Sequence, residues 1–538
     1  MAFHTPAPPL LLERFYLRYP ETTAFSLEAV DLRLAAAERL ALVGPSGCGK
    51  SSLARAVLGL LPPGSETRGR LQLSGQDPFS LSAAALRSLR GRAVGLVFQD
   101  PMTRLNPLLS IGDHLRDLLV AHGHLRGGAL REEARGLLER VGIGPERLGD
   151  YPHQFSGGMR QRVAIALAMA LRPPLVIADE PTTSLDVCVA ARVMEELCSL
   201  CEASGSALLL ITHDLALAGS WCERMAVMEQ GRLLETSSAA RLLTRPEAPL
   251  SRRLVRAARL REGGASPKRQ RTAALLEVRE LRCWHRLAGP LPWQGSWLPA
   301  VDGIDFSLES GETIGVVGAS GCGKSTLCRA LMGLVPLRGG SVLLRGELLH
   351  TLRGSRLRRA RRQLQMVFQD PLACLNPAMT VARAIADPLR IHALEQGRGD
   401  RLQRVQAVLE QVGLTSVRDV LDRLPRQLSG GQQQRVAIAR ALILQPRVLI
   451  CDEAVAMLDS VVQAEILALL RQLREQLGLA ILLITHDLGL AASFCHRVLV
   501  LEQGRIVEEG PGDVLLRQGQ AAATRRLIEA CPRLPRTV

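Results

Sequence analysis

The sequence is poor in lysine and in aromatic residues. Three of its 67 basic residues are lysine, at positions 50, 268 and 324, and aromatic residues make up 3% of the chain. Few aromatic rings leave few platforms on which the bases of a single strand could stack. We therefore read the formal charge of +15 as arginine spread over the surface, and we expect no nucleic-acid partner.

Long apolar runs are also missing. Nothing in the sequence approaches the roughly 18 consecutive apolar residues that a membrane-spanning helix needs, and the N-terminal segment lacks the basic region of a secretory signal. The twelve cysteines are scattered, and Cys48 and Cys322 lie in glycine-rich loops where a disulfide would be disruptive. We expect a soluble, cytoplasmic protein, so a role in transport would need separate membrane subunits. The lone Cys198-x-x-Cys201 pair is interpreted as packing.

The chain is written twice. The segment GPSGCGKSS begins at Gly44 and GASGCGKST begins at Gly318, an offset of 274 residues. VFQDP, SGG, DE and THD follow in the same order in both halves, at offsets of 270 to 273 residues. Such order and spacing indicate a tandem duplication. We predict a first domain over residues 1–251, a linker over 252–271 that includes a short basic helix before Gly263, and a second domain over 272–538.

Each half shows the pattern of an α/β fold. Short apolar segments at 39–43 and 313–317 precede the glycine-rich loops, and those at 175–179 and 448–452 end in a carboxylate. Continuous apolar strands that alternate with helices predict a mostly parallel sheet covered on both faces. The helical pattern between 99 and 179, and between 369 and 452, predicts a helical subdomain inserted into each of two P-loop NTPase domains.

The glycine-rich loops predict two phosphate-binding sites. In a G-x-x-x-x-G-K-S loop between a strand and a helix, backbone amides and the helix N-terminus face the phosphates. Lys50 and Lys324 should reach the β- and γ-phosphates, and Ser51 and Ser325 should ligate Mg²⁺. The loops comprise Gly44, Pro45, Ser46, Gly47, Cys48, Gly49, Lys50, Ser51 and Ser52 in the first half, and Gly318, Ala319, Ser320, Gly321, Cys322, Gly323, Lys324, Ser325 and Thr326 in the second.

Paired acidic residues close a later strand in each half. Asp179 and Asp452 are placed to hold Mg²⁺, and the adjacent Glu180 and Glu453 to position or deprotonate the attacking water. Taken alone, such a pair at a strand end is usually a solvated edge. Downstream of a phosphate loop it indicates a hydrolytic site.

The complete motif set resembles that of ATP-binding cassette (ABC) ATPases. Ser-Gly-Gly before the D-E strand is similar to the signature of that family, and His213 and His486 match its histidine switch, which contacts the γ-phosphate. The resemblance implies two cassettes joined head to tail, so that each ATP lies between one phosphate loop and the other signature. One site would then combine Lys50, Ser51, Gln99, Asp179, Glu180 and His213 with Ser429, Gly430 and Gly431, and the other Lys324, Ser325, Gln369, Asp452, Glu453 and His486 with Ser156, Gly157 and Gly158.

The resemblance also implies further contacts to the nucleotide. Gln99 and Gln369 would reach the Mg²⁺ and the γ-phosphate, completing metal sets of Ser51, Gln99 and Asp179 and of Ser325, Gln369 and Asp452. An aromatic residue ahead of the first strand of the family stacks on adenine, and Tyr19 and Trp284 are the candidates here. Because both catalytic sets are complete, we expect both sites to hydrolyse ATP.

The segment around each glutamine is similar to one branch of the family. The pattern F-Q-D-P-x-x-x-L-N-P, at Gln99 and again at Gln369, resembles importer ATPases for oligopeptides, dipeptides, nickel and related chelates. This implies two transmembrane permease subunits, an extracytoplasmic substrate-binding protein, and a peripheral place at the cytoplasmic face of the inner membrane. The alternatives are a soluble tandem ATPase acting on ribosomes, an exporter ATPase, and a nucleotide-sensing module of a non-transport complex.

Overall fold

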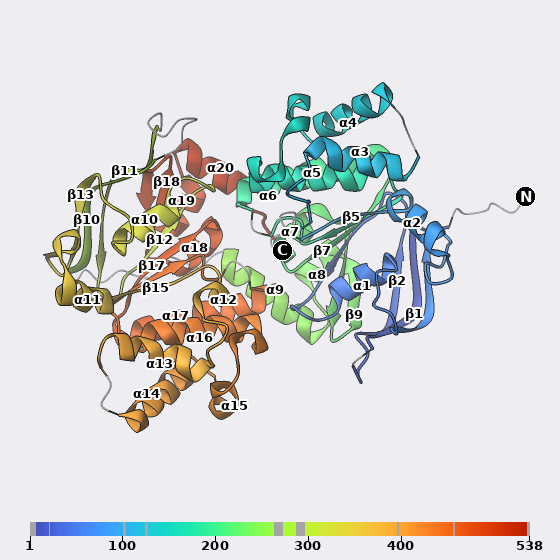
Figure 1. Cartoon of the computed structure of the whole chain (residues 1–538). Coiled ribbons are helices and arrows are strands. Elements are labelled where there is room, and N and C mark those ends of the chain that lie inside the picture. The colour runs from blue at the N-terminus through green and yellow to red at the C-terminus, as the bar shows by residue number, and fades with distance from the viewer. Residues whose placement is uncertain are drawn as a thin grey trace, which may run out of the picture. The chain divides into compact units, whose positions relative to one another are not determined.

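The computed structural model describes residues 7–20, 22–99, 104–123, 127–183, 185–262, 273–286, 296–394, 397–414, 416–455 and 458–534. The chain divides into two compact units, the first formed mainly by residues up to Arg259 and the second mainly by Leu260 to Cys531. Each unit repeats the same order of elements (Figure 1). The exact division into two domains and a linker stays a prediction.

The elements of the first unit follow one another in the order expected for strands alternating with helices. Its strands are β1 (Leu10–Arg18), β2 (Leu27–Leu34), β3 (Arg39–Val43), β4 (Glu66–Leu73), β5 (Val94–Val97), β6 (Leu175–Asp179), β7 (Ala207–Thr212), β8 (Arg224–Glu229) and β9 (Arg232–Ser238). Its helices are α1 (Lys50–Val57), α2 (Ala83–Arg92), α3 (Ile111–Ala121), α4 (Gly128–Arg140), α5 (Gly157–Met169), α6 (Val187–Ser204), α7 (Leu215–Trp221), α8 (Ala239–Thr244) and α9 (Pro249–Glu262).

The second unit has the same plan. Its strands are β10 (Ala274–Arg286), β11 (Trp297–Glu309), β12 (Thr313–Val317), β13 (Gly339–Leu344), β14 (Glu347–Leu348), β15 (Leu364–Val367), β16 (Val448–Asp452), β17 (Ala480–Thr485), β18 (Arg497–Glu502) and β19 (Arg505–Gly510). Its helices are α10 (Lys324–Leu331), α11 (Gly354–Gln363), α12 (Pro371–Cys374), α13 (Val381–Ile391), α14 (Arg398–Gln411), α15 (Val417–Leu421), α16 (Gly430–Leu442), α17 (Ser460–Leu477), α18 (Leu488–Phe494), α19 (Gly512–Gln518) and α20 (Ala522–Ala530).

A six-stranded sheet forms the core of each unit. The strand order is β5-β6-β7-β3-β8-β9 in the first and β15-β16-β17-β12-β18-β19 in the second. All neighbouring strands are parallel except the last pair, β8 with β9 and β18 with β19. Strands such as β7 and β17 are buried along their whole length, as both faces of the sheet are covered. The prediction of a mostly parallel sheet is confirmed.

A smaller antiparallel sheet, absent from the sequence-based prediction, precedes the parallel one. It has the order β2-β1-β4 in the first unit and β11-β10-β13-β14 in the second. These strands alternate buried with exposed residues, as in the pattern of β2, because one face packs on the core and the other meets solvent.

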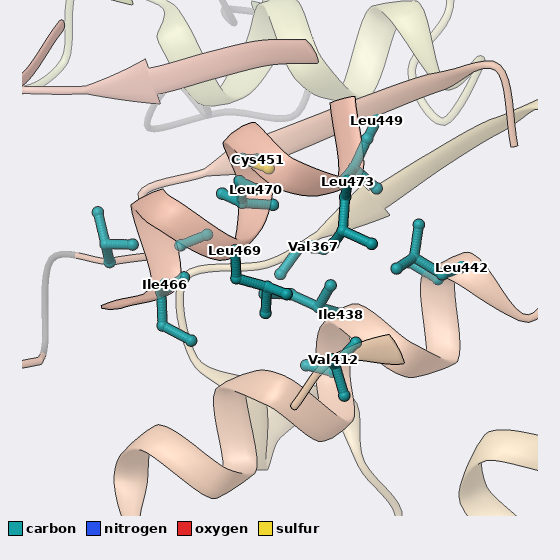
Figure 2. Packing of buried hydrophobic residues seen from close by; sticks show 14 of the residues in the cluster. Val367, Val412, Ile438, Leu442, Leu449, Cys451, Ile466, Leu469, Leu470 and Leu473 are labelled. Carbon is teal, nitrogen blue, oxygen red and sulfur yellow. The ribbon is translucent and has the colours of Figure 1, made fainter. Parts of the chain in front are cut away.

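The predicted helical subdomains are present. In the first unit α3, α4 and α5 lie together between β5 and β6, and in the second α13 to α16 lie between β15 and β16 (Figure 1). Figure 2 shows how the second subdomain joins its sheet. Ile438 and Leu442 of α16 meet a row of leucines on α17, and Leu449 of β16 closes the cluster from the sheet. This apolar packing ties the signature segment to the sheet.

The start of the predicted linker is helical. The basic helix expected before Gly263 is α9, whose Leu254, Val255, Ala257 and Ala258 are buried. Residues 263–271 of the predicted linker lie outside the described residues. Within the described part of the chain, no helix is both long enough and apolar enough to span a bilayer.

Candidate functional site

The predicted site residues of each unit gather at one edge of its parallel sheet. In the first unit, β3 leads into the phosphate loop, β6 ends at Asp179, and Gln99 and His213 follow β5 and β7. These four strands are neighbours in the order β5-β6-β7-β3, and parallel strands present their carboxyl ends at the same edge. The second unit repeats the arrangement with Gln369, Asp452 and His486.

Each phosphate loop closes over its own lysine. Lys50 is 6% exposed, and its Nζ donates to the carbonyl oxygen of Gly44 at 2.8 Å. Lys324 is 7% exposed and donates to Gly318 at 2.7 Å. The buried ammonium is therefore held over the start of the helix that follows, where the backbone amides and the helix dipole also favour an anion.

The residue before each lysine must be glycine for two reasons. Gly49 has φ = 112° and Gly323 has φ = 110°, in the region that side chains other than glycine rarely adopt. A Cβ on Gly323 would also lie 2.1 Å from the carbonyl oxygen of Ala300. Close approach of backbone to backbone thus shapes the loop as much as its conformation does.

A glutamate carboxylate stands at the centre of each site. Oε2 of Glu180 accepts from Nε2 of Gln99 at 2.9 Å and from Oγ1 of Thr183 at 3.0 Å, and Oε1 faces Nδ1 of His213 at 3.1 Å. The predicted glutamine, glutamate and histidine are thus brought together from three neighbouring strands. The same contacts hold Glu453 in the second unit, where Gln369 Nε2 donates at 2.8 Å and His486 Nδ1 lies at 3.5 Å.

The two glutamates are held in a strained backbone conformation. Glu180 has φ = 48° and Glu453 has φ = 47°, values that cost a residue with a Cβ about 1–3 kcal/mol. Each backbone amide donates to the neighbouring strand, Glu180 to Ile211 at 2.8 Å and Glu453 to Ile484 at 3.0 Å. Such strain persists only where the surroundings over-determine the conformation, and it turns each carboxylate toward the phosphate loop side of the sheet edge.

Neighbouring carboxyl groups of each site have pKa values shifted in opposite directions. Burial raises the pKa of Asp179, as does the nearby charge of Glu180, although a hydrogen bond from Ser51 acts the other way. Burial also acts to raise the pKa of Glu180, but the hydrogen bond from His213 and further attractive contacts outweigh it and the pKa lies below its usual value. Asp452 and Glu453 show the same two directions. The outer glutamate is therefore the carboxylate of the pair that stays ionised most readily.

The Ser-Gly-Gly segments begin the helices of the two subdomains. Ser156 caps α5, its Oγ accepting from the amide of Met159, and Ser429 caps α16 in the same way. The second glycine of each segment lies against the next helix of its unit. A Cβ on Gly158 would meet Cγ1 of Val189 at 2.3 Å, and one on Gly431 would meet Val462 at 2.7 Å.

The predicted adenine contacts differ between the units. The hydroxyl of Tyr19 donates to Oγ of Ser52 at 3.2 Å. In the second unit the equivalent contact is made by His285, whose Nε2 lies 3.0 Å from Oγ1 of Thr326. Trp284 is the preceding residue of β10, so its side chain points to the opposite face of the strand, where it is 40% exposed.

Strand register shows the same correspondence. Leu17 pairs with Leu27 in the first unit, and Cys283 pairs with Val301 in the second. Leu27 and Val301 are 274 residues apart, the offset between the phosphate loops, so Leu17 matches Cys283 and Tyr19 matches His285. His285 is thus a candidate residue that the sequence-based prediction missed in favour of Trp284.

Comparison with protein families places this geometry. The family described as "ABC transporter" matches residues 27–183 and again residues 301–456. The chain belongs to the ABC transporter family. It is an ATP-binding protein with two fused cassettes, and its activity is ATP hydrolysis.

Relatives within the ABC family align over both cassettes. YejF of Escherichia coli K12, described as an uncharacterized ABC transporter ATP-binding protein, is 40% identical over 95% of this chain and 97% of its own length. The peptidoglycan transport ATP-binding protein YejF of Agrobacterium fabrum is 39% identical over 94% of this chain and 93% of its own. The glutathione import ATP-binding protein GsiA of Salmonella choleraesuis is 38% identical over 94% and 86%.

The two ABC cassettes differ at one contact to the central glutamate. Thr183 donates to Glu180 in the first cassette. At the offset of 273 residues that relates the signatures and the D-E pairs, the second cassette has Ala456, which has no hydroxyl group. Ala456 itself lies outside the described residues.

Proposed function

We propose that the chain is the ATP-hydrolysing subunit of an ABC importer and that both of its sites turn over ATP. The observation that carries the proposal is the glutamine–glutamate–histidine cluster, which occurs complete in both cassettes. A cassette that only sensed or bound nucleotide would have no need of an ionised carboxylate held by two partners beside a phosphate loop.

The roles of the side chains follow from their chemistry. Glu180 and Glu453 position the attacking water and accept its proton, since a hydrogen-bonded carboxylate of lowered pKa stays ionised at neutral pH. Lys50 and Lys324 bind the β- and γ-phosphates, and His213 and His486 contact the γ-phosphate while orienting the glutamate. Tyr19 supports the adenine of the first cassette, and we assign that position in the second to His285 rather than Trp284.

The residues present fit a magnesium ion. Ser51, Gln99 and Asp179 provide hydroxyl, amide and carboxylate oxygens, as do Ser325, Gln369 and Asp452, and Mg²⁺ prefers oxygen ligands and phosphates. Two adjacent and largely buried carboxyl groups, one with a raised pKa, form a place where a cation would relieve the repulsion. Bound there, the ion would neutralise charge on the phosphate oxygens.

We further propose that each site is composite. Ser429, Gly430 and Gly431 would complete the site of the first phosphate loop, and Ser156, Gly157 and Gly158 that of the second. In support, each signature serine caps a helix whose N-terminal amides are suited to an anion. ATP would then bind the closed pair of cassettes best, and its hydrolysis would allow them to open.

The cargo class is inferred from the glutamine segment and from the names of the relatives. Glutathione, named for one relative, is a small peptide, and peptidoglycan, named for another, carries peptide chains. We propose uptake of peptides or metal chelates, with two permease subunits and a substrate-binding protein as partners. The chain would then lie at the cytoplasmic face of the inner membrane, held there by the permease.

Single replacements of the glutamates, tested in the complete transporter, examine this proposal. The chain is purified with its co-expressed permease subunits, and ATP hydrolysis and peptide uptake are measured in vesicles for Glu180→Gln, for Glu453→Gln and for the double variant. We expect each single variant to lose on the order of a hundredfold or more in hydrolysis and the double variant to be inactive. Full activity in one single variant would show that its site is dispensable, and co-purification with ribosomes without permeases would contradict the importer role.

A further inference from the structure

Helix α11 of the second cassette carries an unusual density of positive charge. Five of its ten residues are arginine, and Arg353 precedes it. No acidic residue occurs between Glu347 and Asp370, a stretch with six arginines in all. The matching stretch of the first cassette, between Asp77 and Asp100, has three. The excess is therefore local to one cassette and is more than the general arginine preference of the chain.

The arginines of α11 divide into an inner and an outer set. Arg361 and Arg362 are partly buried and donate to the carbonyl oxygens of Gly333 at 3.1 Å and Leu444 at 3.4 Å. Ala360 is 5% exposed and belongs to the core beneath the helix. The outer set consists of Arg356, Arg358 and Arg359, all of them exposed. The helix is thus anchored by its inner face and turns guanidinium groups to solvent.

The outer arginines lack carboxylate partners in the part of the chain that the structure describes. No ion pair to Arg356, Arg358 or Arg359 is formed there, although many other surface arginines form one. A further cationic group stands close by, since burial and the charges of Arg358 and Arg362 lower the pKa of His392, at the end of α13. Positive charges that gather without counter-charges favour an external anionic surface.

The neighbouring side chains distinguish between anionic surfaces. Neither α11 nor α13 contains an aromatic residue, and aromatic platforms are what single-stranded nucleic acids stack upon. The residue before His392 is instead Ile391, an aliphatic side chain that is 54% exposed. Clustered arginines on one helix face with an aliphatic side chain close by are typical of surfaces that meet lipid headgroups.

We propose that the outer face of α11, formed by Arg356, Arg358 and Arg359, binds anionic phospholipid headgroups of the membrane. The contact adds a second attachment to the one through the permease, and it does not rest on the proposed transport role. The planar guanidinium group can donate two hydrogen bonds to one phosphate. Because the contact lies on the second cassette alone, it would give the fused pair a preferred orientation at the membrane.

The test measures sedimentation of the full-length purified chain with phosphatidylcholine vesicles, with and without phosphatidylglycerol, over a range of salt concentrations. We expect binding to the anionic vesicles that weakens with salt, since screening shortens the reach of the charges. The triple variant R356Q/R358Q/R359Q should bind on the order of a hundredfold more weakly. Glutamine keeps the helix propensity of arginine, so the fold should survive the change.

The matched control removes the same charge from another helix. Arg252, Arg253 and Arg256 are exposed on α9, and the variant R252Q/R253Q/R256Q should bind anionic vesicles as the unaltered chain does. Lysine at the three α11 positions should retain most of the binding. Equal losses in both glutamine variants would overturn the proposal in favour of net charge. Absence of binding to anionic vesicles would overturn it too, as would retention on RNA alone.

Hydrolysis of ATP in solution is measured in parallel and separates this proposal from the transport role. The α11 variant should hydrolyse ATP at the unaltered rate, because the outer face of α11 forms no part of the candidate sites. A loss of vesicle binding with unchanged hydrolysis supports the lipid contact. A fall in both would indicate that α11 acts on the cassette fold, and the proposal would fail.

Discussion

The Nδ1 atom of His213 lies 3.1 Å from Oε1 of Glu180, and the two residues come from the ends of neighbouring strands, β7 and β6. The matching distance between His486 and Glu453 is 3.5 Å. The contact fixes the carboxylate at one oxygen, while the glutamine amide fixes it at the other. A carboxylate held at both oxygens is pre-organised to act on a water molecule, since little reorientation is left for the moment of reaction.

Thr183→Ala should shift the pH dependence of the first site. The threonine hydroxyl donates to Oε2 of Glu180 and helps to keep its pKa below the usual value. Removing a donor to the charged form raises the pKa, so the acid limb of the rate profile should move to higher pH. The rate at neutral pH should fall by up to about tenfold.

The measurement follows ATP hydrolysis against pH in the Glu453→Gln background, where only the first site reports. Thr182→Ala is the control, because no contact from that side chain to Glu180 is found among the described residues. An acid limb that stays in place in the Thr183 variant would show that the hydroxyl does not act through the carboxylate.

The strands of the parallel sheet could be predicted residue by residue. The apolar segments at 39–43 and 175–179 are β3 and β6 themselves, with the same first and last residues. A strand buried on both faces leaves a continuous apolar run in the sequence, which is a local signal. The order of the motifs was equally visible, because each follows one of these strands.

The position of His285 could not be predicted in the same way. It depends on how β10 pairs with β11, and the register of that pair shifts near Trp284. Register is a property of two strands and of the core beneath them, and the residues inserted between these strands hide the equivalent spacing. Likewise, the hydrogen bond between Gln99 and Glu180 joins residues 81 positions apart and leaves no local pattern.

His285→Ala should weaken nucleotide binding to one of the two sites. His285 matches Tyr19 in register and in its contact to the start of the helix after the phosphate loop. Loss of a stacking partner costs about 1–3 kcal/mol, so affinity at that site should fall between about fivefold and a hundredfold. Trp284→Ala should change it far less, since the indole lies on the other face of β10.

Calorimetric titration with a non-hydrolysable ATP analogue checks this prediction. In Tyr19→Ala and in His285→Ala a different half of the sites should weaken, and in the double variant both should. A larger loss in Trp284→Ala than in His285→Ala would return the adenine contact to the tryptophan.

Gly158→Ala should destabilise the first cassette through packing. The new methyl would lie 2.3 Å from Cγ1 of Val189 on α6, so α5 and α6 would have to move apart. Overpacking of this kind costs about 1–3 kcal/mol, which lowers Tm by several degrees for a domain of this size. The double variant with Val189→Ala removes the obstructing methyl group and should recover most of the loss.

Thermal unfolding without nucleotide is the appropriate measurement, because it separates packing from any contact of the signature with ATP. Gly136→Ala is the matched control. It lies within α4 with open space around it, and alanine there should stabilise the helix by up to about 1 kcal/mol. Equal destabilisation by the two alanines would rule out the contact with Val189 as the cause.

The C-terminal helix of each cassette begins at a carboxylate of the preceding strand. Glu508 accepts from the amides of Gln520 at 2.8 Å and Ala521 at 3.1 Å, and Thr524 donates to it as well. In the first cassette Glu235 accepts from the amides of Glu247 and Ala248. Desolvation acts to raise the pKa of both carboxyls, but these hydrogen bonds outweigh it and lower the pKa.

Glu508→Gln should therefore destabilise the second cassette in a pH-dependent manner. A carboxyl whose pKa is lower in the folded state stabilises the fold above its unfolded pKa of about 4.3, and this stabilisation is lost as pH falls through the folded value. At pH 7 the variant should lose about 1 kcal/mol, the worth of a helix cap. Denaturant unfolding at pH 7 and at about pH 3 checks the sign. The difference between variant and unaltered chain should shrink at the lower pH, and a difference that is constant or that grows there would contradict a role for the ionised carboxylate.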